Sequence, residues 1–168
     1  MNRRMIVQLS LASAALPSMG FAQSSQTSVS AEAKHAADTL QAGTIALETS
    51  RLALQKATDP NVKRFAGFEA AEQETMGSVL KNASRQEAPK LDNEGKAMVE
   101  TLAGMPAGKS FDAAYVKGQI DGHNKLLGIQ ESYLSSGKDG THRSIAALAR
   151  GHIKEHLANL EVLEKAVR

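Results

Sequence analysis

The chain has 168 residues, of which 42% are hydrophobic and 23% charged, and it contains no cysteine. This is the length of a single domain, and it suffices to bury a hydrophobic core without a disulfide or a structural zinc ion. The absence of cysteine excludes thiol catalysis, thiolate metal sites and disulfide frameworks. The 20 basic and 18 acidic residues are interleaved along the chain, which argues against a nucleic-acid partner because such partners require a basic surface.

The first residues have the pattern of a cleavable signal peptide. Arg3 and Arg4 precede a short apolar run, and small residues follow at Gly20 and Ala22. The run is shorter than the roughly 20 apolar residues that span a bilayer. We therefore predict a signal peptide over residues 1–22 with cleavage after Ala22, a periplasmic or secreted location, and no transmembrane segment in the mature chain. The arginine pair also resembles a twin-arginine export signal, so both export routes remain open.

Two long helices are predicted next along the chain. Residues 23–29 are rich in Ser, Gln and Thr and predict a flexible mature N-terminus, after which helical periodicity begins at Ser30. The first helix is predicted to end at Asp59-Pro60, because an N-cap residue followed by proline is the usual start of a new helix. The second helix is predicted over residues 60–84.

Beyond the second helix the sequence predicts a connection rich in glycine and proline and then two more long helices. Each boundary rests on a turn or capping signal. The predicted elements are a short helix between Asp92 and Leu102, a third long helix over residues 111–135 capped by Ser110, a turn at residues 137–141 and a fourth long helix over residues 142–167.

These elements predict an all-α domain over residues 30–168. No alternating run of β-branched or aromatic residues reaches the length of a strand. Four helices of about 24 to 28 residues predict a ferritin-like four-helix bundle, with a long connection between its second and third helices. That connection can cross the length of the bundle, but simple up-and-down connectivity also remains open. The apolar stripes assigned to the core include Leu54, Val79 and Leu148.

Each long helix also carries acidic or histidine residues inside its apolar stripe. A rise of 1.5 Å per residue places all of these residues near the middle of the bundle. Carboxylates and imidazoles that converge from several helices are the ligands of buried Fe, Mn or Zn sites. Two alternatives remain open, namely a metal-free polar network that fixes helix register and simple surface placement. The candidate metal ligands are Glu48, Glu69, Glu72, His123, His152 and His156.

Several segments resemble the bacterial domain-of-unknown-function family four-one-four-two. They are the run from Asp59 to Ala66, the sequence Phe111-Asp112-x-x-Tyr115 with His123 after it, and the sequence Glu155-His156-Leu157. The resemblance covers about residues 32–166. It implies an exported protein of the ferritin-like superfamily, often labelled an outer-membrane protein, and it implies no activity.

The resemblance also bears on the candidate ligands. The histidines of the third and fourth long helices match the family at His123 and His156. The family commonly has an Asp-His pair in the second helix, where this chain has Glu72-Gln73. The resemblance therefore supports the two histidines more strongly than any imidazole ligand from the second helix.

The sequence leaves two classes of function open. One is a periplasmic metal-binding bundle that acts in metal handling or stress response. The other is a non-enzymatic envelope protein that has a structural role or binds a partner, either a second copy of this chain or another envelope protein. The chain lacks a Gly-x-Ser-x-Gly elbow, a phosphate loop and a His-Glu-x-x-His motif, so a hydrolase is disfavoured.

Overall fold

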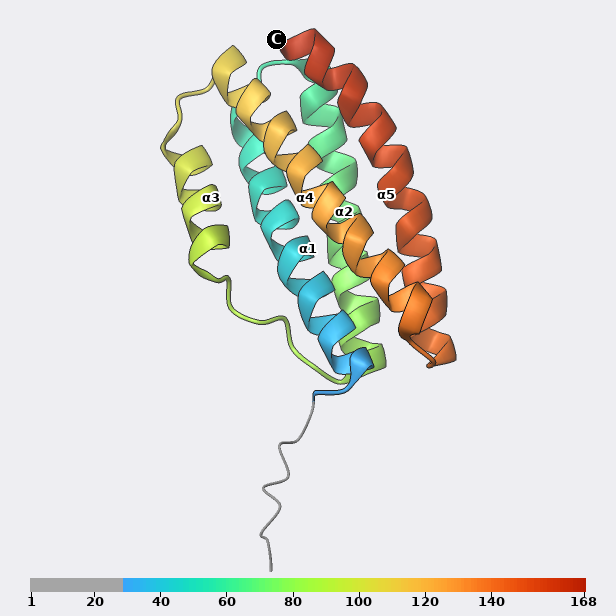
Figure 1. Ribbon diagram of the computed structural model, residues 1–168. Coiled ribbons are helices and arrows are strands. Elements are labelled where there is room, and N and C mark those ends of the chain that lie inside the picture. The colour runs from blue at the N-terminus through green and yellow to red at the C-terminus, as the bar shows by residue number, and fades with distance from the viewer. Residues whose placement is uncertain (1–28) are drawn as a thin grey trace, which may run out of the picture.

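The computed structural model describes residues 29–168, which form five α-helices and no strand. The all-helical prediction is therefore confirmed, together with the short helix in the long connection (Figure 1). The predicted signal peptide, its cleavage after Ala22 and the stretch up to residue 28 lie outside the described residues. The helices are α1 (Ala31–Lys56), α2 (Pro60–Ser84), α3 (Asn93–Gly104), α4 (Lys109–Ser136) and α5 (Gly140–Val167).

Local capping explains where most of these helices begin. Ser30, Asp59 and Asp139 precede α1, α2 and α5, and each side chain accepts a hydrogen bond from a backbone N–H of the first turn. The prediction that Ser110 caps the third long helix is wrong. Helix α4 begins at Lys109, two residues before the predicted start, and Gly108 precedes it with a φ of 142°, a conformation that glycine adopts more readily than other residues.

The four long helices form two antiparallel pairs, α1 with α2 and α4 with α5 (Figure 1). Helix α1 also packs on α4, and α2 packs more sparsely on α5. The turn between α1 and α2 contacts the start of α4, whereas the start of α1 contacts the end of α4 and the start of α5. Helices α2 and α4 therefore run in the same direction. Of the two topologies left open by the sequence, the structure has the long crossover, with α3 packed outside α1 and α4.

Apolar clusters fill the two ends of this arrangement. Near the turn between α1 and α2, the core includes Phe65, Phe111 and Leu160. At the opposite end, Leu80 from α2 and Ile145 from α5 pack together with the start of α1. A third apolar cluster contains Ala42 of α1, Leu126 of α4 and Ala149 and Ile153 of α5, and buried polar side chains lie between these clusters. No helix within residues 29–168 has both the length and the apolar character to cross a membrane.

The buried faces differ in part from the predicted stripes. Leu54, Val79 and Leu148 are exposed, Leu148 by 66%, so their assignment to the core is wrong. On α5 the buried positions beside Leu148 are Ala146 and Ala149. Small side chains bring neighbouring helices close together, so alanine can face the core while a larger leucine beside it faces solvent.

Asp112 fastens the turn between α1 and α2 to the start of α4. Its buried carboxylate accepts hydrogen bonds from the backbone N–H groups of Thr58 and Asp59 and from the Thr58 hydroxyl. Phe111 and Tyr115 on either side of it are fully buried. The Phe-Asp-x-x-Tyr segment therefore has a structural role, because it attaches the start of α4 to the turn between α1 and α2.

We expect Asp112→Ala to lower the free energy of unfolding by about 3 kcal/mol, because it leaves several buried donors without their charged acceptor. Urea unfolding followed by circular dichroism measures this change. Asp121→Ala is the matched control on α4, since Asp121 is exposed and pairs only with Lys117 at the surface. A loss of similar size in both variants would contradict the role of Asp112.

Candidate metal centre

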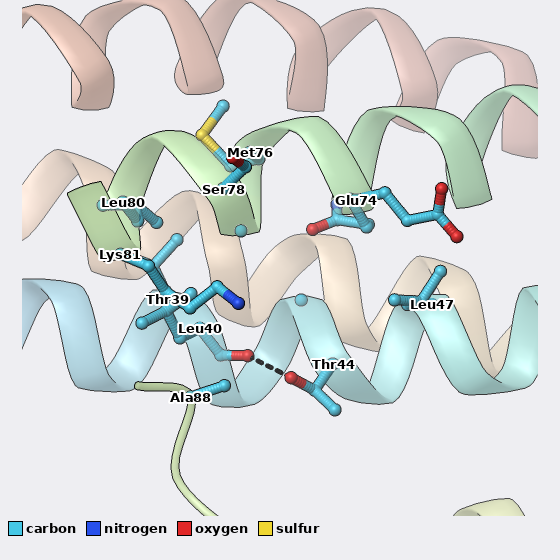
Figure 2. A pocket seen from close by; sticks show the side chains of 13 residues that line it. Thr39, Leu40, Thr44, Leu47, Glu74, Met76, Ser78, Leu80, Lys81 and Ala88 are labelled. Carbon is cyan, nitrogen blue, oxygen red and sulfur yellow. Dashed lines mark hydrogen bonds between the residues drawn. The ribbon is translucent and has the colours of Figure 1, made fainter. Parts of the chain in front are cut away.

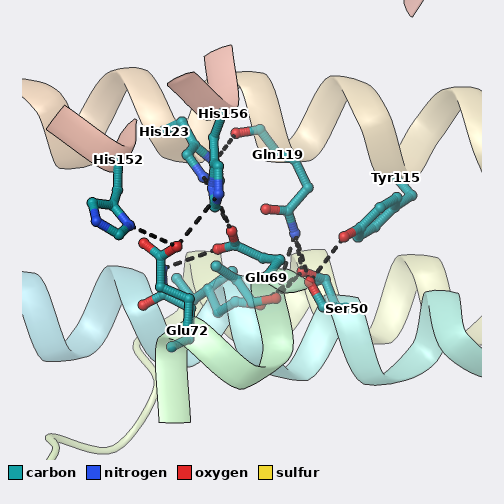
Figure 3. A network of polar contacts seen from close by, with 12 residues as sticks. Ser50, Glu69, Glu72, Tyr115, Gln119, His123, His152 and His156 are labelled. Atoms are coloured by element: carbon teal, nitrogen blue, oxygen red, sulfur yellow. Dashed lines mark hydrogen bonds and ion pairs between the residues drawn. The ribbon is translucent and has the colours of Figure 1, made fainter. Parts of the chain in front are cut away.

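Three ligand-type side chains meet in the interior of the bundle, between its apolar clusters. They are Glu69 from α2, His123 from α4 and His156 from α5 (Figure 3). Glu69 and His123 are buried, and 12% of the His156 side chain is exposed. Among the described residues, these three form the one group of potential metal ligands whose donor atoms all lie within 4.8 Å of one another. We call this group the inner triad.

A backbone hydrogen bond fixes the orientation of His123. Its Nδ1 lies 2.8 Å from the carbonyl oxygen of Gln119, one turn earlier in α4. A carbonyl can only accept, so Nδ1 carries the hydrogen, and Nε2 of the neutral ring presents a lone pair to the inner triad. Metal-binding histidines are commonly held in this way, with the second ring nitrogen bonded to a carbonyl.

Glu69 is an ionised carboxylate inside the protein. Burial raises its pKa, but the nearby His123 and His156 rings, in their protonated forms, outweigh this effect and lower the pKa to about 2. Its Oε1 accepts a hydrogen bond of 3.0 Å from the Gln73 amide. Its Oε2 lies 2.9 Å from His156 Nδ1 and 3.3 Å from His123 Nε2, yet no donor is aligned with it for a hydrogen bond.

His156 faces acidic groups on both sides of its ring. Burial lowers its pKa, but Glu69 outweighs this effect, with a smaller contribution from Glu72, and the pKa rises above 6.5. His156 Nδ1 lies 3.1 Å from His123 Nε2, and its Nε2 lies 3.4 Å from Glu72 Oε2. In the metal-free protein a proton on Nδ1 is thus directed at His123, while Glu69 Oε2 lies to one side.

The separations of the donor atoms in the inner triad are compatible with a single transition-metal ion. Two ligand atoms that are each about 2.1 Å from one ion lie about 3.0 to 3.4 Å apart at coordination angles of about 90° to 110°. The three separations between Glu69 Oε2, His123 Nε2 and His156 Nδ1 are 2.9, 3.1 and 3.3 Å. Two imidazoles and one carboxylate on one face are also a common ligand set for Fe and Zn.

The other candidate ligands lie outside the inner triad. Glu72 and His152 contact each other at 3.2 Å beside it, and His152 is 58% exposed. Glu48 pairs with Arg51 at the surface, and 40% of its side chain is exposed. The structure therefore brings five of the six candidates into one row and leaves Glu48 apart from them.

A chain of buried polar side chains continues from His123 toward the turn between α1 and α2 (Figure 3). The Gln119 amide donates to Thr49 Oγ1 at 2.9 Å, and Ser50 Oγ lies 2.9 Å from the Tyr115 hydroxyl. Gln119 Oε1 is buried without a donor. These contacts were not predicted from the sequence, although the spacing of four residues between Tyr115, Gln119 and His123 places them on one face of a helix.

A cavity of about 250 Å³ lies between α1 and α2 (Figure 2). The Thr44 hydroxyl in its wall donates to the Leu40 carbonyl of its own helix. Gln73 also lines the cavity, and a Cβ atom at Gly43 would lie 2.5 Å from its amide oxygen. Gly43 thus leaves room for Gln73, which separates the cavity from Glu69.

His35 and His142 form a second buried pair at the opposite end of α4. Both are buried, with Nδ1 atoms 3.1 Å apart, and His35 Nε2 lies 2.8 Å from Gln130 Oε1. Burial lowers the pKa of His35, which favours its neutral form. Both ring nitrogens of His35 and the Nδ1 of His142 therefore lie within hydrogen-bonding distance of another protein atom.

The family of the chain follows from its sequence. Residues 17–163 match the family described as Domain of unknown function (DUF4142). The chain belongs to this family. This confirms the resemblance seen in the segments around Asp59, Phe111 and His156. No curated protein matches this DUF4142 chain.

Two solved structures share the fold of the DUF4142 chain. One is a DUF305 protein of Streptomyces coelicolor, named as a candidate secreted protein, with a TM-score of 0.70, 16% identity, and coverage of 82% of this chain and 92% of that one. The other is a DUF305 fragment from Deinococcus radiodurans, with a TM-score of 0.71, 15% identity, and coverage of 80% and 96%. At these identities the similarity concerns the fold alone.

Proposed function

We propose that this DUF4142 protein is an exported, ferritin-like helical bundle that binds one transition-metal ion, either Fe, Mn or Zn, at Glu69, His123 and His156. Its role would be in metal handling or in the response to stress. The carboxylate offsets the charge of the cation, and the imidazoles suit metals of borderline softness. The ion would take the place of the proton that His156 carries in the metal-free protein.

One observation supports metal binding most directly. Glu69 Oε2 is fully buried and ionised, and it faces two imidazole nitrogens with no hydrogen-bond donor aligned to it. Buried carboxylate oxygens normally have such a donor, because an unsatisfied charge in the interior is costly. A cation among the three donor atoms would satisfy Glu69 Oε2 and the His123 lone pair together.

The location and the bundle type rest on separate observations. The basic and apolar start of the sequence supports a signal peptide over residues 1–22, and the similar Streptomyces coelicolor protein is named as a candidate secreted protein. The parallel direction of α2 and α4, joined by a long crossover, supports the ferritin-like topology.

A metal-free polar network is the second candidate, and it also has a specific basis. The inner triad already forms close contacts without a cation, since His156 Nδ1 lies within hydrogen-bonding distance of both Glu69 and His123. In that case the polar network of Glu69, His123 and His156 would hold α2 against α4 and α5. The protein would then serve as an envelope component that binds a second copy or another envelope protein.

Elemental analysis of the untagged protein separates these candidates. The chain is expressed with its own leader and purified from the periplasm without a chelator. We expect about one Fe, Mn or Zn per chain, because the triad offers one ligand set. A folded protein that contains none of these metals and takes up none when Fe and Zn are added back would reject the metal proposal and favour the structural network.

A further inference from the structure

A second and shallower pair of ligand-type side chains lies directly outside the inner triad. Glu72 is one turn from Glu69 on α2, and His152 is one turn from His156 on α5, so the same two helices supply both pairs. His152 Nδ1 lies 3.2 Å from Glu72 Oε2. The exposed fraction of the side chains falls from 58% at His152 to 23% at Glu72, 12% at His156 and 0% at Glu69.

His156 connects the shallow pair to the deep one. Its Nδ1 lies 2.9 Å from Glu69 Oε2, and its Nε2 lies 3.4 Å from Glu72 Oε2. The two nitrogens of one imidazole ring have lone pairs or hydrogens that point in different directions. The same side chain can therefore bind a cation with Nε2 on the outer side and with Nδ1 on the inner side.

Other directions of approach to the inner triad are occupied. The Phe65 ring packs against the rings of His156 and His123, with centroid separations of 5.3 and 6.3 Å. Gln73 is bonded to Glu69 and stands between the triad and the neighbouring cavity. Figure 3 shows Glu72 and His152 at the opposite end of the polar row from Tyr115.

The geometry points to an outer cation-binding site at Glu72 and His152, where a divalent transition-metal ion binds first and then passes His156 into the inner triad. This inference rests on the proposed function and names the access route to its site. One carboxylate and one imidazole bind the same cations as the triad, but with fewer ligands, so the ion is released again readily.

The transfer is an exchange of ligands without a change of oxidation state. Bonds from the ion to Glu72, His152 and His156 Nε2 break, and bonds to Glu69, His123 and His156 Nδ1 form. The proton on His156 Nδ1 passes through water to Nε2, so that His156 stays a neutral ligand. The outer site therefore sets the rate at which the triad is filled and emptied.

Stopped-flow mixing of the metal-free protein with Co²⁺ tests this route, because the visible absorption of Co²⁺ changes when nitrogen and oxygen ligands replace water. We expect His152→Ala and Glu72→Gln each to slow uptake by about ten-fold, and to slow removal by a chelator by a similar factor. Glu155→Gln is the matched control. It removes one exposed negative charge next to His156 in the sequence, and we expect uptake within about two-fold of the wild type.

Three other outcomes would contradict the outer site or the proposed function. Equal uptake rates in the wild type and both variants would overturn the outer site and leave the proposed function standing. Loss of the bound Co²⁺ at equilibrium in His152→Ala would also overturn it, because His152 would then be a ligand of the final site. If the wild type takes up neither Co²⁺ in this assay nor Zn²⁺ in a calorimetric titration, the proposed function fails and the outer site fails with it.

Discussion

Replacing His123 and His156 together with alanine is expected to abolish stoichiometric metal binding. The double variant leaves Glu69 as the one remaining ligand of the inner triad, and a single carboxylate does not hold Fe, Mn or Zn against water. In the wild type, metal at about 1,000 times its dissociation constant adds about 4 kcal/mol of stability, which raises the melting temperature by about 10 °C. We expect no such rise in the double variant.

The second buried histidine pair supplies the control for this experiment. His35→Ala combined with His142→Ala removes the same two side chains from a buried site at the other end of the molecule. Both double variants are expected to be less stable than the wild type without metal, because each leaves a cavity and unpaired polar groups. Elemental analysis and thermal unfolding with and without Zn²⁺ measure the difference. Retention of metal by His123→Ala/His156→Ala, or its loss from both variants, would contradict the assignment.

The metal-free protein is expected to show a characteristic dependence of stability on pH, which Glu69→Gln removes. The pKa of Glu69 is lowered from 4.5 to about 2, so its contribution is present above about pH 4.5 and is lost as the pH falls toward 2. The pKa of His156 is raised above 6.5, so its contribution is present below pH 6.5 and is lost as the pH rises through the raised value. The advantage of the wild type over Glu69→Gln should therefore be largest between about pH 4.5 and 6.5.

The size of this advantage follows from the Glu69 shift. A lowering from 4.5 to about 2 corresponds to about 3 kcal/mol at most, since one pKa unit is worth about 1.4 kcal/mol. Urea unfolding of both proteins in a chelator, from pH 3 to pH 8.5, measures the profile. Glu48→Gln is the control, because Glu48 pairs with Arg51 at the surface, and its difference from the wild type should stay small and nearly flat. A flat difference for Glu69→Gln would show that the buried contacts are not an ion pair.

The helices themselves could be predicted from local sequence. The second helix was predicted over residues 60–84, and α2 has these bounds, because Asp59 caps it and Pro60 suits its first position. Glycine and proline in the connection limited the short helix to about its observed place. Capping, turn formation and helical periodicity depend on residues within a few positions of one another, so they can be inferred without knowledge of the fold.

The direction in which each helix faces depends on tertiary packing. The buried face of α1 consists mainly of small residues, among them Ala42, Gly43, Ala46 and Ala53, whereas the larger Leu54 is exposed. The spacing of Glu48 from Ile45 and Leu52 predicts that Glu48 faces inward, but the close packing of α1 against α2 and α4 turns it outward.

The sequence by itself thus determined an all-helical chain with acidic and histidine residues near the middle of its helices. Only the tertiary structure decided that Glu69, His123 and His156 meet, that Glu48 does not join them, and that Glu72 and His152 lie just outside. The physical reason is that the rotation of a helix about its axis follows from the shapes of the side chains on neighbouring helices, which lie far away in the sequence.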